Sequence, residues 1–278
     1  QFTMGSFTDT ILIPYDFTEK ADYAVRHAAV MGKNMKAELV LLNIVKKQSQ
    51  DQEVLEQLNP VCDKFTEELG IKTIPLVREG TIFKTINEVV DELKSIVVVM
   101  GTHGMKGIQK LTGSWALKVI VGCHVPYLIV QDEPKYSNPA NILFPVDYKL
   151  ETKEKLKWVS MLGYLCNIRV CLFGQEGNGP MYDNPAKANM SFCKRYLEER
   201  DIPYDVVWVD QRGSFYELSL KYANENNVDI IMITTTRDIA FHDYILGAYE
   251  QTIIANDAGI PVFVVNPRTE VKLAYTNF

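Results

Sequence analysis

The residues best suited to bind a ligand lie between positions 101 and 114. This segment reads GTHGMKGIQKLTGS and follows an apolar run at 97–100. Its four glycines allow backbone N–H groups to approach an anion without interference from a Cβ atom. Gly113 and Ser114 also begin a predicted helix, whose N-terminus would offer unpaired N–H donors and partial positive charge. The pattern predicts a phosphate-binding loop, with a plain glycine-rich turn as the alternative.

Asp16 is the second candidate group, because it ends another apolar run, at 10–15. In a doubly wound sheet the fourth strand commonly returns beside the first, and ligands bind where the winding reverses. Asp16 and the glycine-rich loop would then face each other across one crevice. This arrangement suits a nucleotide, with the base and ribose beside Asp16 and the phosphates on the glycines. The loop is neither a P-loop nor the usual dinucleotide fingerprint, because the spacing and the following residues differ.

Patterns for other chemistry are missing from the sequence. His27 and His124 have no partners at zinc-ligand spacing, and no Ser/His/Asp set or Gly-x-Ser-x-Gly elbow occurs. His103 lies within the loop, where we expect it to shape the loop or contact phosphate rather than act as a general base. We therefore predict no catalytic residue and no metal site. Six aromatic residues of the second half are predicted to belong to the core: Trp158, Tyr164, Tyr196, Trp208, Tyr216 and Tyr222.

The elements that must position these groups occur twice along the chain. ILIPYD at 11–16 is matched by ILFPVD at 142–147, and VVVM at 97–100 by IIMI at 230–233. VPYLIV at 125–130 is likewise matched by IPVFVV at 260–265. The three offsets are 131, 133 and 135 residues, in the same order. The chain is therefore predicted to be a tandem duplication.

Each repeat alternates strands with helices. In the first repeat, apolar and helical periodicity predicts strands at 10–15, 38–45, 72–77, 96–100 and 127–131, and helices at 18–31, 51–69, 81–93 and 114–122. A βαβαβαβαβ order implies a parallel sheet covered by helices on both faces. The predicted fold class is α/β, with two tandem doubly wound domains that each contain a five-stranded parallel sheet.

The polar segment 132–139 contains two prolines and is the predicted linker. The domains are then expected at 4–131 and 140–267, and the polar stretch 174–185 is interpreted as an insertion in the second. Duplicated domains often keep the contact of an ancestral homodimer. We therefore expect the two repeats to pack as a pseudo-symmetric pair; a further homo-oligomer stays open.

Composition narrows the class of protein. The chain has 278 residues, a net charge of −6 and a pI near 5.4, which argues against a nucleic-acid surface. No apolar run approaches the ~18 residues of a membrane span, and the first residues do not resemble a signal peptide. The five cysteines form no CxxC pair, so reduced buried thiols are expected. These observations predict a cytoplasmic protein with no nucleic-acid or membrane partner.

Three segments resemble the universal stress protein family: IPYDFT at 13–18, LLNIV at 41–45, and MGTHG at 100–104 with Gly113-Ser114. The resemblance covers both halves, as in tandem members of that family. It implies an adenine nucleotide alpha hydrolase-like, Rossmann-like fold and a site for ATP, alone or with Mg²⁺. By resemblance, the adenosine pocket would include Pro14, Asp16 and Ile44, and the phosphate loop Met100, Gly101, His103, Gly104, Gly113, Ser114 and Trp115.

One departure concerns the loop length. The family signature places nine residues between its second glycine and the Gly-Ser/Thr pair, whereas here eight residues, 105–112, separate Gly104 from Gly113. The second repeat departs further, because Asp147 is retained but residues 234–237 read TTTR and Gly247 is followed by alanine. We expect the second half to be a degenerate structural copy; the alternative is a site for a different anion. One nucleotide per chain is therefore predicted.

The resemblance implies a regulatory or stress-protective role in which nucleotide occupancy changes shape or partner choice. An alternative is an interaction module or scaffold that works without nucleotide. A slow ATP hydrolase ranks third, because no carboxylate cluster for Mg²⁺ is evident near the loop.

Overall fold

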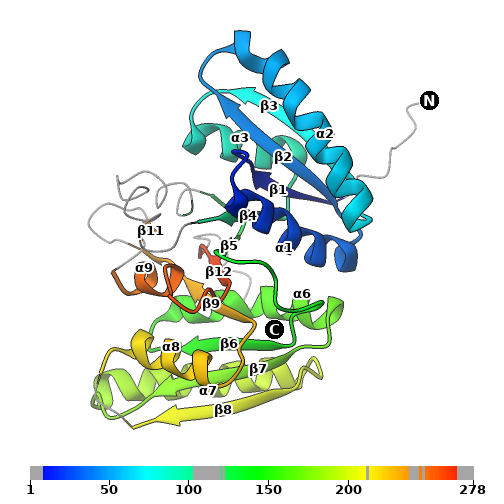
Figure 1. The fold of residues 1–278 in the computed structure, drawn as a ribbon. Helices are drawn as coiled ribbons and strands as arrows, with labels where there is room; N and C mark the ends of the chain where they lie inside the picture. Colours follow the sequence, from blue (N-terminus) through cyan, green and yellow to red (C-terminus); the bar gives the residue numbers. More distant parts are fainter. Residues whose placement is uncertain are drawn as a thin grey trace, which may run out of the picture.

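The computed structural model describes residues 9–102, 120, 123–210, 213–237, 244–245 and 248–267. Ten of the described strands form one sheet, with the order β3-β2-β1-β4-β5-β12-β9-β6-β7-β8 (Figure 1). Their bounds are β1 Thr10–Pro14, β2 Glu38–Val45, β3 Thr73–Glu79, β4 Val97–Gly101, β5 Tyr127–Val130, β6 Asn141–Val146, β7 Arg169–Gln175, β8 Tyr204–Val209, β9 Ile230–Thr234 and β12 Val262–Val265. Two further strands, β10 (Thr236–Arg237) and β11 (Tyr244–Ile245), pair separately.

The two halves of this sheet repeat one topology. In the first half β1 lies between β2 and β4, and in the second half β6 lies between β7 and β9. The β1–β4 pair joins Ile11 to Val97, and the β6–β9 pair joins Ile142 to Ile230, both in parallel. The winding therefore reverses beside the first strand of each half, as predicted from the repeated apolar runs.

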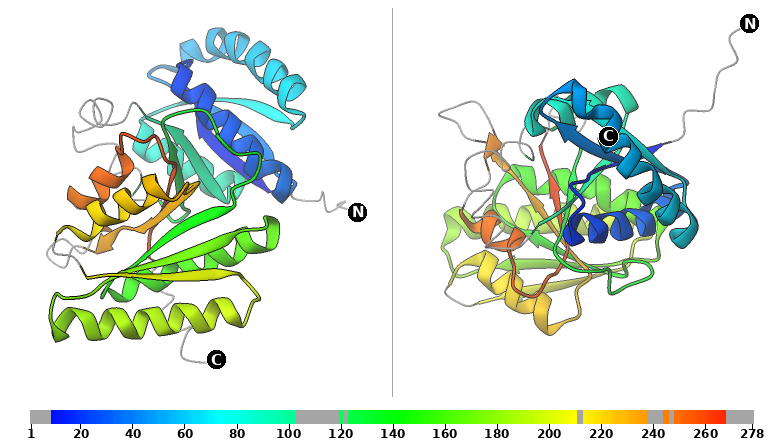
Figure 2. Two further views of the ribbon diagram at one scale, coloured as in Figure 1. Left: turned by 60° about the horizontal axis from the view of Figure 1, so that its bottom comes forward. Right: turned by 45° about the horizontal axis from the view of Figure 1, so that its top comes forward.

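The halves meet at their closing strands. β5 and β12 pair antiparallel, with Leu128 opposite Phe263, whereas the other pairs of the large sheet are parallel. The two repeats thus pack against each other as a pair, as expected from the duplication. Because both closing strands take part, the two predicted five-stranded sheets are continuous across this seam (Figure 2).

Helices cover both faces of the sheet, in two layers. The helices are α1 Glu19–Met35, α2 Asp51–Leu69, α3 Ile82–Leu93, α6 Leu156–Leu165, α7 Pro180–Glu198, α8 Phe215–Glu225 and α9 Ala248–Ile254, with short 3₁₀ helices at Gln48–Gln50 and Leu150–Lys155. One buried cluster combines residues of α1, α2, α6 and α7 with alternate strand residues such as Ile11 and Ile13. The other combines α3, α8 and α9 with the intervening residues, such as Leu12. The alternation reflects the two-residue period of a strand buried on both faces.

Helix α1 is longer than the sequence predicts. Its N-cap is Thr18, whose side chain accepts a hydrogen bond from Ala21 N, and it continues past the expected end at Met31 to Met35. Gly32 favours termination locally, but a Cβ atom there would lie 2.6 Å from Ile71 Cδ1. Gly32 therefore lies inside α1, with Ile71 packed closely against it.

Two further predictions for the second half are wrong. The stretch 174–185 is only partly a loop, because α7 begins at Pro180 and contains Pro185. Pro180 is the first residue of α7, where the missing N–H would have no helical partner. Tyr164, expected in the core, is 90% exposed.

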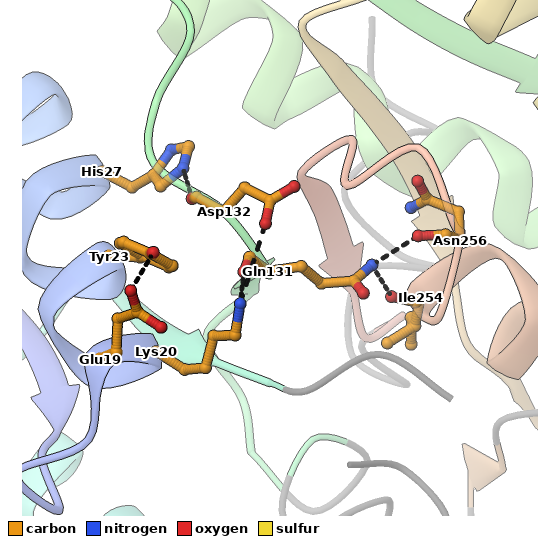
Figure 3. A network of polar contacts seen from close by, with 8 residues as sticks. All are labelled: Glu19, Lys20, Tyr23, His27, Gln131, Asp132, Ile254 and Asn256. Atoms are coloured by element: carbon orange, nitrogen blue, oxygen red, sulfur yellow. Dashed lines mark hydrogen bonds and ion pairs between the residues drawn. The ribbon is translucent and has the colours of Figure 1, made fainter. Parts of the chain in front are cut away.

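Polar contacts hold the segment that follows β5 against both halves (Figure 3). Lys20 Nζ donates to Gln131 O at 2.6 Å, and His27 Nε2 lies 3.0 Å from Asp132 O. The Gln131 side chain donates to Ile254 O at 3.2 Å and to Asn256 O at 2.9 Å. The start of the linker is therefore joined to α1 on one side and to the end of α9 on the other.

Candidate functional site

The carboxyl end of β1 carries Asp16 in an exposed turn. Asp16 Oδ1 accepts hydrogen bonds from Thr18 N at 3.2 Å and from Thr18 Oγ1 at 2.5 Å. These local bonds form an Asx-type turn that leads into α1. Among the described residues both bonds reach Oδ1, so Oδ2 is available to a ligand.

Phe17 is a candidate that sequence reasoning missed. Its φ angle is 62°, in the left-handed region that non-glycine residues rarely adopt, and its side chain is 42% exposed. The ring meets Tyr15 edge-on, with centroids 5.4 Å apart. An exposed aromatic residue in this conformation, next to Asp16, is typical of a functional site. The available signal was that both repeats place an aromatic residue after the aspartate, Phe17 and Tyr148.

The carboxyl end of β4 lies beside this turn, because β1 and β4 are paired. Met100 is buried, and Gly101 follows it. A Cβ atom at Gly101 would lie 2.0 Å from the backbone oxygen of Lys20. This glycine is thus required for the close approach of β4 to the first turn of α1, whatever else it does.

Thr102 begins the glycine-rich loop and is almost fully buried. Its backbone N–H donates to Val130 O at 2.8 Å, but its hydroxyl oxygen has no hydrogen-bond partner within the part of the chain that the structure describes. A buried polar atom without a partner is uncommon and calls for an explanation.

The remaining predicted residues divide into two sets. Pro14 and Ile44 are half-buried at the carboxyl ends of β1 and β2, where the Asn43 side chain donates to Tyr15 O at 2.8 Å. The fold thus brings the ends of β1, β2 and β4 to one edge of the sheet. These strand ends carry the first five predicted residues: Pro14, Asp16, Ile44, Met100 and Gly101. Five other predicted residues lie outside the described residues: His103, Gly104, Gly113, Ser114 and Trp115.

The equivalent edge of the second half contains a cavity of ≈ 380 Å³. Asp147, the counterpart of Asp16, lines it, together with Tyr148 and Tyr216. Tyr216 also packs against the buried cluster of α3, α8 and α9, as expected for a core residue. Burial, with the nearby carboxylates of Asp147 and Glu250, raises the pKa of Tyr216 and keeps its hydroxyl protonated.

A buried lysine distinguishes this half from the first. Lys155 is 131 residues after the buried Ala24, and only 2% of it is exposed. Its Nζ donates to Pro145 O at 2.6 Å and lies 4.3 Å from the centroid of the Phe144 ring. Burial lowers the pKa of Lys155 to about 8, partly opposed by the attraction of Asp147.

The threonines after β9 do not all remain available to an anion. Thr235 Oγ1 donates to Asn266 Oδ1 at 2.8 Å, and Thr236 and Arg237 form β10, which pairs with β11. The expected loop after Ile233 is therefore partly a two-stranded ladder.

Metal binding finds no support in the described ranges. They contain no group of three or more His, Cys, Asp or Glu residues that could hold an ion. His27 is buried, with its ring nitrogens beside Tyr136 Oη at 3.1 Å and Asp132 O. The five cysteines are free, and Cys62, Cys123 and Cys193 are buried. In the ranges that the structure covers, no helix is both long and apolar enough to cross a membrane.

Comparison with known proteins identifies the family. The model of the universal stress protein family matches residues 8–131. A universal stress protein of Methanocaldococcus jannaschii is 28% identical over 145 residues, which cover 45% of this chain and 83% of the relative. One from Synechocystis sp. is 30% identical over 106 residues, covering 34% of this chain and 68% of the relative. The crystal structure of a universal stress protein from Archaeoglobus fulgidus shares the fold across both halves, with a TM-score of 0.72, 18% identity, and coverage of 92% of this chain and 98% of that one. The chain belongs to the universal stress protein family.

Proposed function

We propose that the chain binds ATP or a related adenine nucleotide in its first half, and that occupancy serves a regulatory or stress-protective role. The observation that carries the proposal is the pairing of β1 with β4, which puts Asp16 and the start of the glycine-rich loop at the winding reversal. Membership of the universal stress protein family supports it. We propose that the two domains span residues 4–131 and 140–267. A cytoplasmic location is also proposed, because it is compatible with a regulatory or stress-protective role.

The chemistry at the strand ends is appropriate for an adenosine group. Asp16 Oδ2 can accept a hydrogen bond from a ribose hydroxyl, because the bonds to Thr18 reach the other oxygen. Pro14 and Ile44 supply half-buried apolar surface, and the exposed ring of Phe17 can pack on a planar base.

The buried hydroxyl of Thr102 supports a ligand on the loop side. Leaving such a group without a partner costs about 1–3 kcal/mol. A phosphate oxygen would offset that cost by accepting its hydrogen bond. Gly104, Gly113 and Ser114 would then supply backbone donors, as the family resemblance implies.

Calorimetric titration of the full chain with ATP tests the proposal. Asp16→Asn keeps the Oδ1 acceptor for Thr18 but replaces the free carboxylate oxygen, so we expect at least tenfold weaker binding. Asp147→Asn makes the same change in the second half and should leave ATP affinity unchanged. Nucleotide released from the purified protein on denaturation should be an adenine nucleotide, and saturation should occur near one per chain.

Two results would overturn the proposal. The absence of any ATP binding would favour the scaffold alternative, in which neither crevice is used. Loss of ATP binding in Asp147→Asn, with Asp16→Asn unaffected, would show that the nucleotide binds in the second half. Release of ADP during the titration would instead add a slow hydrolase activity to the proposed site.

A further inference from the structure

The large sheet ends in two edge strands, β3 in the first half and β8 in the second (Figure 1). An edge strand turns a row of backbone N–H and C=O groups away from the sheet, and another chain can pair with that row. Proteins usually block such edges with proline, with charged side chains or with covering contacts. The two edges of this sheet differ in whether they are blocked.

The ladder bonds show which backbone groups face outward. In β3, Lys72 O and Gly80 N bond to β2, so the even-numbered residues between them do the same and the odd-numbered ones face outward. In β8, Pro203 O and Val209 O bond to β7, so here the even-numbered residues face outward. The outward-facing residues are therefore Thr73, Pro75, Val77 and Glu79 in β3, and Tyr204, Val206 and Trp208 in β8.

The outer edge of β3 is blocked at three successive outward-facing residues. The N–H of Thr73 donates to Thr66 Oγ1 at 3.0 Å. Pro75 has no N–H to offer. The carbonyl of Val77 accepts a hydrogen bond from Arg78 Nη1 at 3.3 Å. A further strand could not form a regular ladder along this edge.

The outer edge of β8 carries no such protection. Within the described part of the chain, the outward-facing N–H and C=O groups of β8 bond to no other group. The strand contains neither proline nor lysine, and its central outward-facing residue, Val206, is 37% exposed. An open edge with an apolar residue at its centre is a site for pairing with another strand.

The side chains of β8 are complementary to a second copy of the same strand. Antiparallel pairing about a two-fold axis at Val206 puts Val206 opposite its own copy and Tyr204 opposite Trp208 of the second copy. Both rings are held on one face of the sheet: the Tyr204 hydroxyl donates to Glu198, and the Trp208 ring covers Gly174, where a Cβ atom would lie 2.5 Å from Cζ3. Aromatic side chains that lie opposite each other stabilise antiparallel strand pairs.

Charge does not oppose this arrangement. Asp205 is the one charged residue within β8, and it lies opposite Val207 of the second copy in this register. Its Oδ2 atom already forms an ion pair with Arg169 Nη1 at 2.8 Å. The pairing therefore brings no uncompensated charge against a like charge.

We propose that β8 is a homodimerisation edge, at which two copies of the chain pair their β8 strands antiparallel about Val206. Residues that face each other in this register exchange two backbone hydrogen bonds. Because the β3 edge is blocked, the assembly closes at two copies instead of growing into a fibre. The proposal does not depend on nucleotide binding in the first half.

Sedimentation velocity of the full chain tests the proposal. A pair of six-residue strands buries less surface than a standard interface, so the mass should rise from 31.6 kDa toward twice that value between about 1 and 200 μM. Val206→Lys places two ammonium groups next to each other across the axis and should weaken association at least tenfold. Val77→Lys is the matched control, because it makes the same change at an outward-facing residue of the blocked edge and should leave association unchanged.

A mixture of variants tests the register. Val206→Glu alone should dissociate like Val206→Lys, but an equimolar mixture of the two should form dimers, because the axis then joins opposite charges. Recovery in the mixture would also show that each variant is folded. A wild-type chain that stays monomeric over the whole range would refute the proposal, as would association that survives Val206→Lys. A monomeric mixture of variants that circular dichroism shows to be folded would exclude two-fold pairing at Val206.

Discussion

Gln131 and Asn266 occupy equivalent positions after the two closing strands, and each donates its side-chain amide to the opposite half. Gln131 Nε2 bonds Ile254 O and Asn256 O, whereas Asn266 Nδ2 bonds Ile120 O and, at 2.7 Å, Cys123 O. Each amide therefore satisfies two carbonyl groups across the seam. The antiparallel pairing of β5 and β12 is reinforced at both ends by this reciprocal exchange.

Replacing one of these amides should weaken the whole chain. Asn266→Leu leaves two carbonyl groups across the seam without their donor, and we expect a loss of about 1–3 kcal/mol in the free energy of unfolding. Denaturant titration measures it. Asn226→Leu is the control, because the side chain of Asn226 makes a solvent-exposed bond to Tyr222 O at 2.8 Å, away from the seam. Equal effects of the two substitutions would contradict the assigned role.

Gly101→Ala should destabilise the fold strongly, because the new Cβ atom would collide with the carbonyl of Lys20. We expect a loss of about 3 kcal/mol, at the upper end of overpacking effects. Gly70→Ala provides the comparison: Gly70 has φ +62° but nothing within 4 Å of a Cβ atom, so only about 1 kcal/mol should be lost. A smaller effect at Gly101 than at Gly70 would show that α1 shifts easily. Gly101 is therefore not the glycine to replace when binding alone is to be measured.

The stability of the protein should fall in mild acid because of His27. Burial lowers the pKa of His27 to about 4, whereas an unfolded histidine titrates near 6.5. Between these values the unfolded chain binds more protons, so acid favours unfolding, by up to about 3 kcal/mol at pH 4. His27→Gln removes this titration.

The free energy of unfolding of wild type and His27→Gln should be compared from pH 4 to 8 by urea titration. The difference between their free energies of unfolding should be constant above pH 7.5, where histidine is neutral in both states. Below pH 6.5 the wild type should lose stability relative to His27→Gln. Parallel curves over the whole range would show that His27 is not held neutral by the fold.

Lys155 should make the stability of the protein rise with pH in alkaline solution. Its pKa is about 8 in the folded chain and near 10.4 when unfolded, so below pH 8 the fold holds a costly buried charge. As pH rises from 8 to 10.4 the folded chain loses this proton first. Stability relative to Lys155→Met should therefore rise by up to about 3 kcal/mol. Denaturant titration measures it, with the exposed Lys157→Met as control; no rise would mean that Lys155 is hydrated.

Most of the fold could be predicted because the apolar pattern of a strand can be recognised in a short stretch of sequence. The Val- and Ile-rich runs at 97–100 and 230–233 specified buried strands, and their repetition specified the order around β1 and β6. Features decided by tertiary contact could not be predicted, such as the close packing of Ile71 over Gly32 inside α1. Spacing alone also did not show which side of a helix meets the sheet, and Tyr164 was therefore misplaced. The nearness of the strand ends that carry Asp16 and Gly101 could be predicted, whereas the backbone conformation of Phe17 has no pattern in a single sequence.

The antiparallel seam has a consequence for access to the two ends of the sheet. All parallel strands of one half run opposite to those of the other, so the turn that carries Asp16 and the cavity beside Asp147 open at opposite ends of one continuous sheet. Molecules held at the two ends cannot touch each other, and a protein that covers one end leaves the other accessible. β5 and β12 join the two halves within the sheet. The two ends of the sheet can therefore be covered independently of each other.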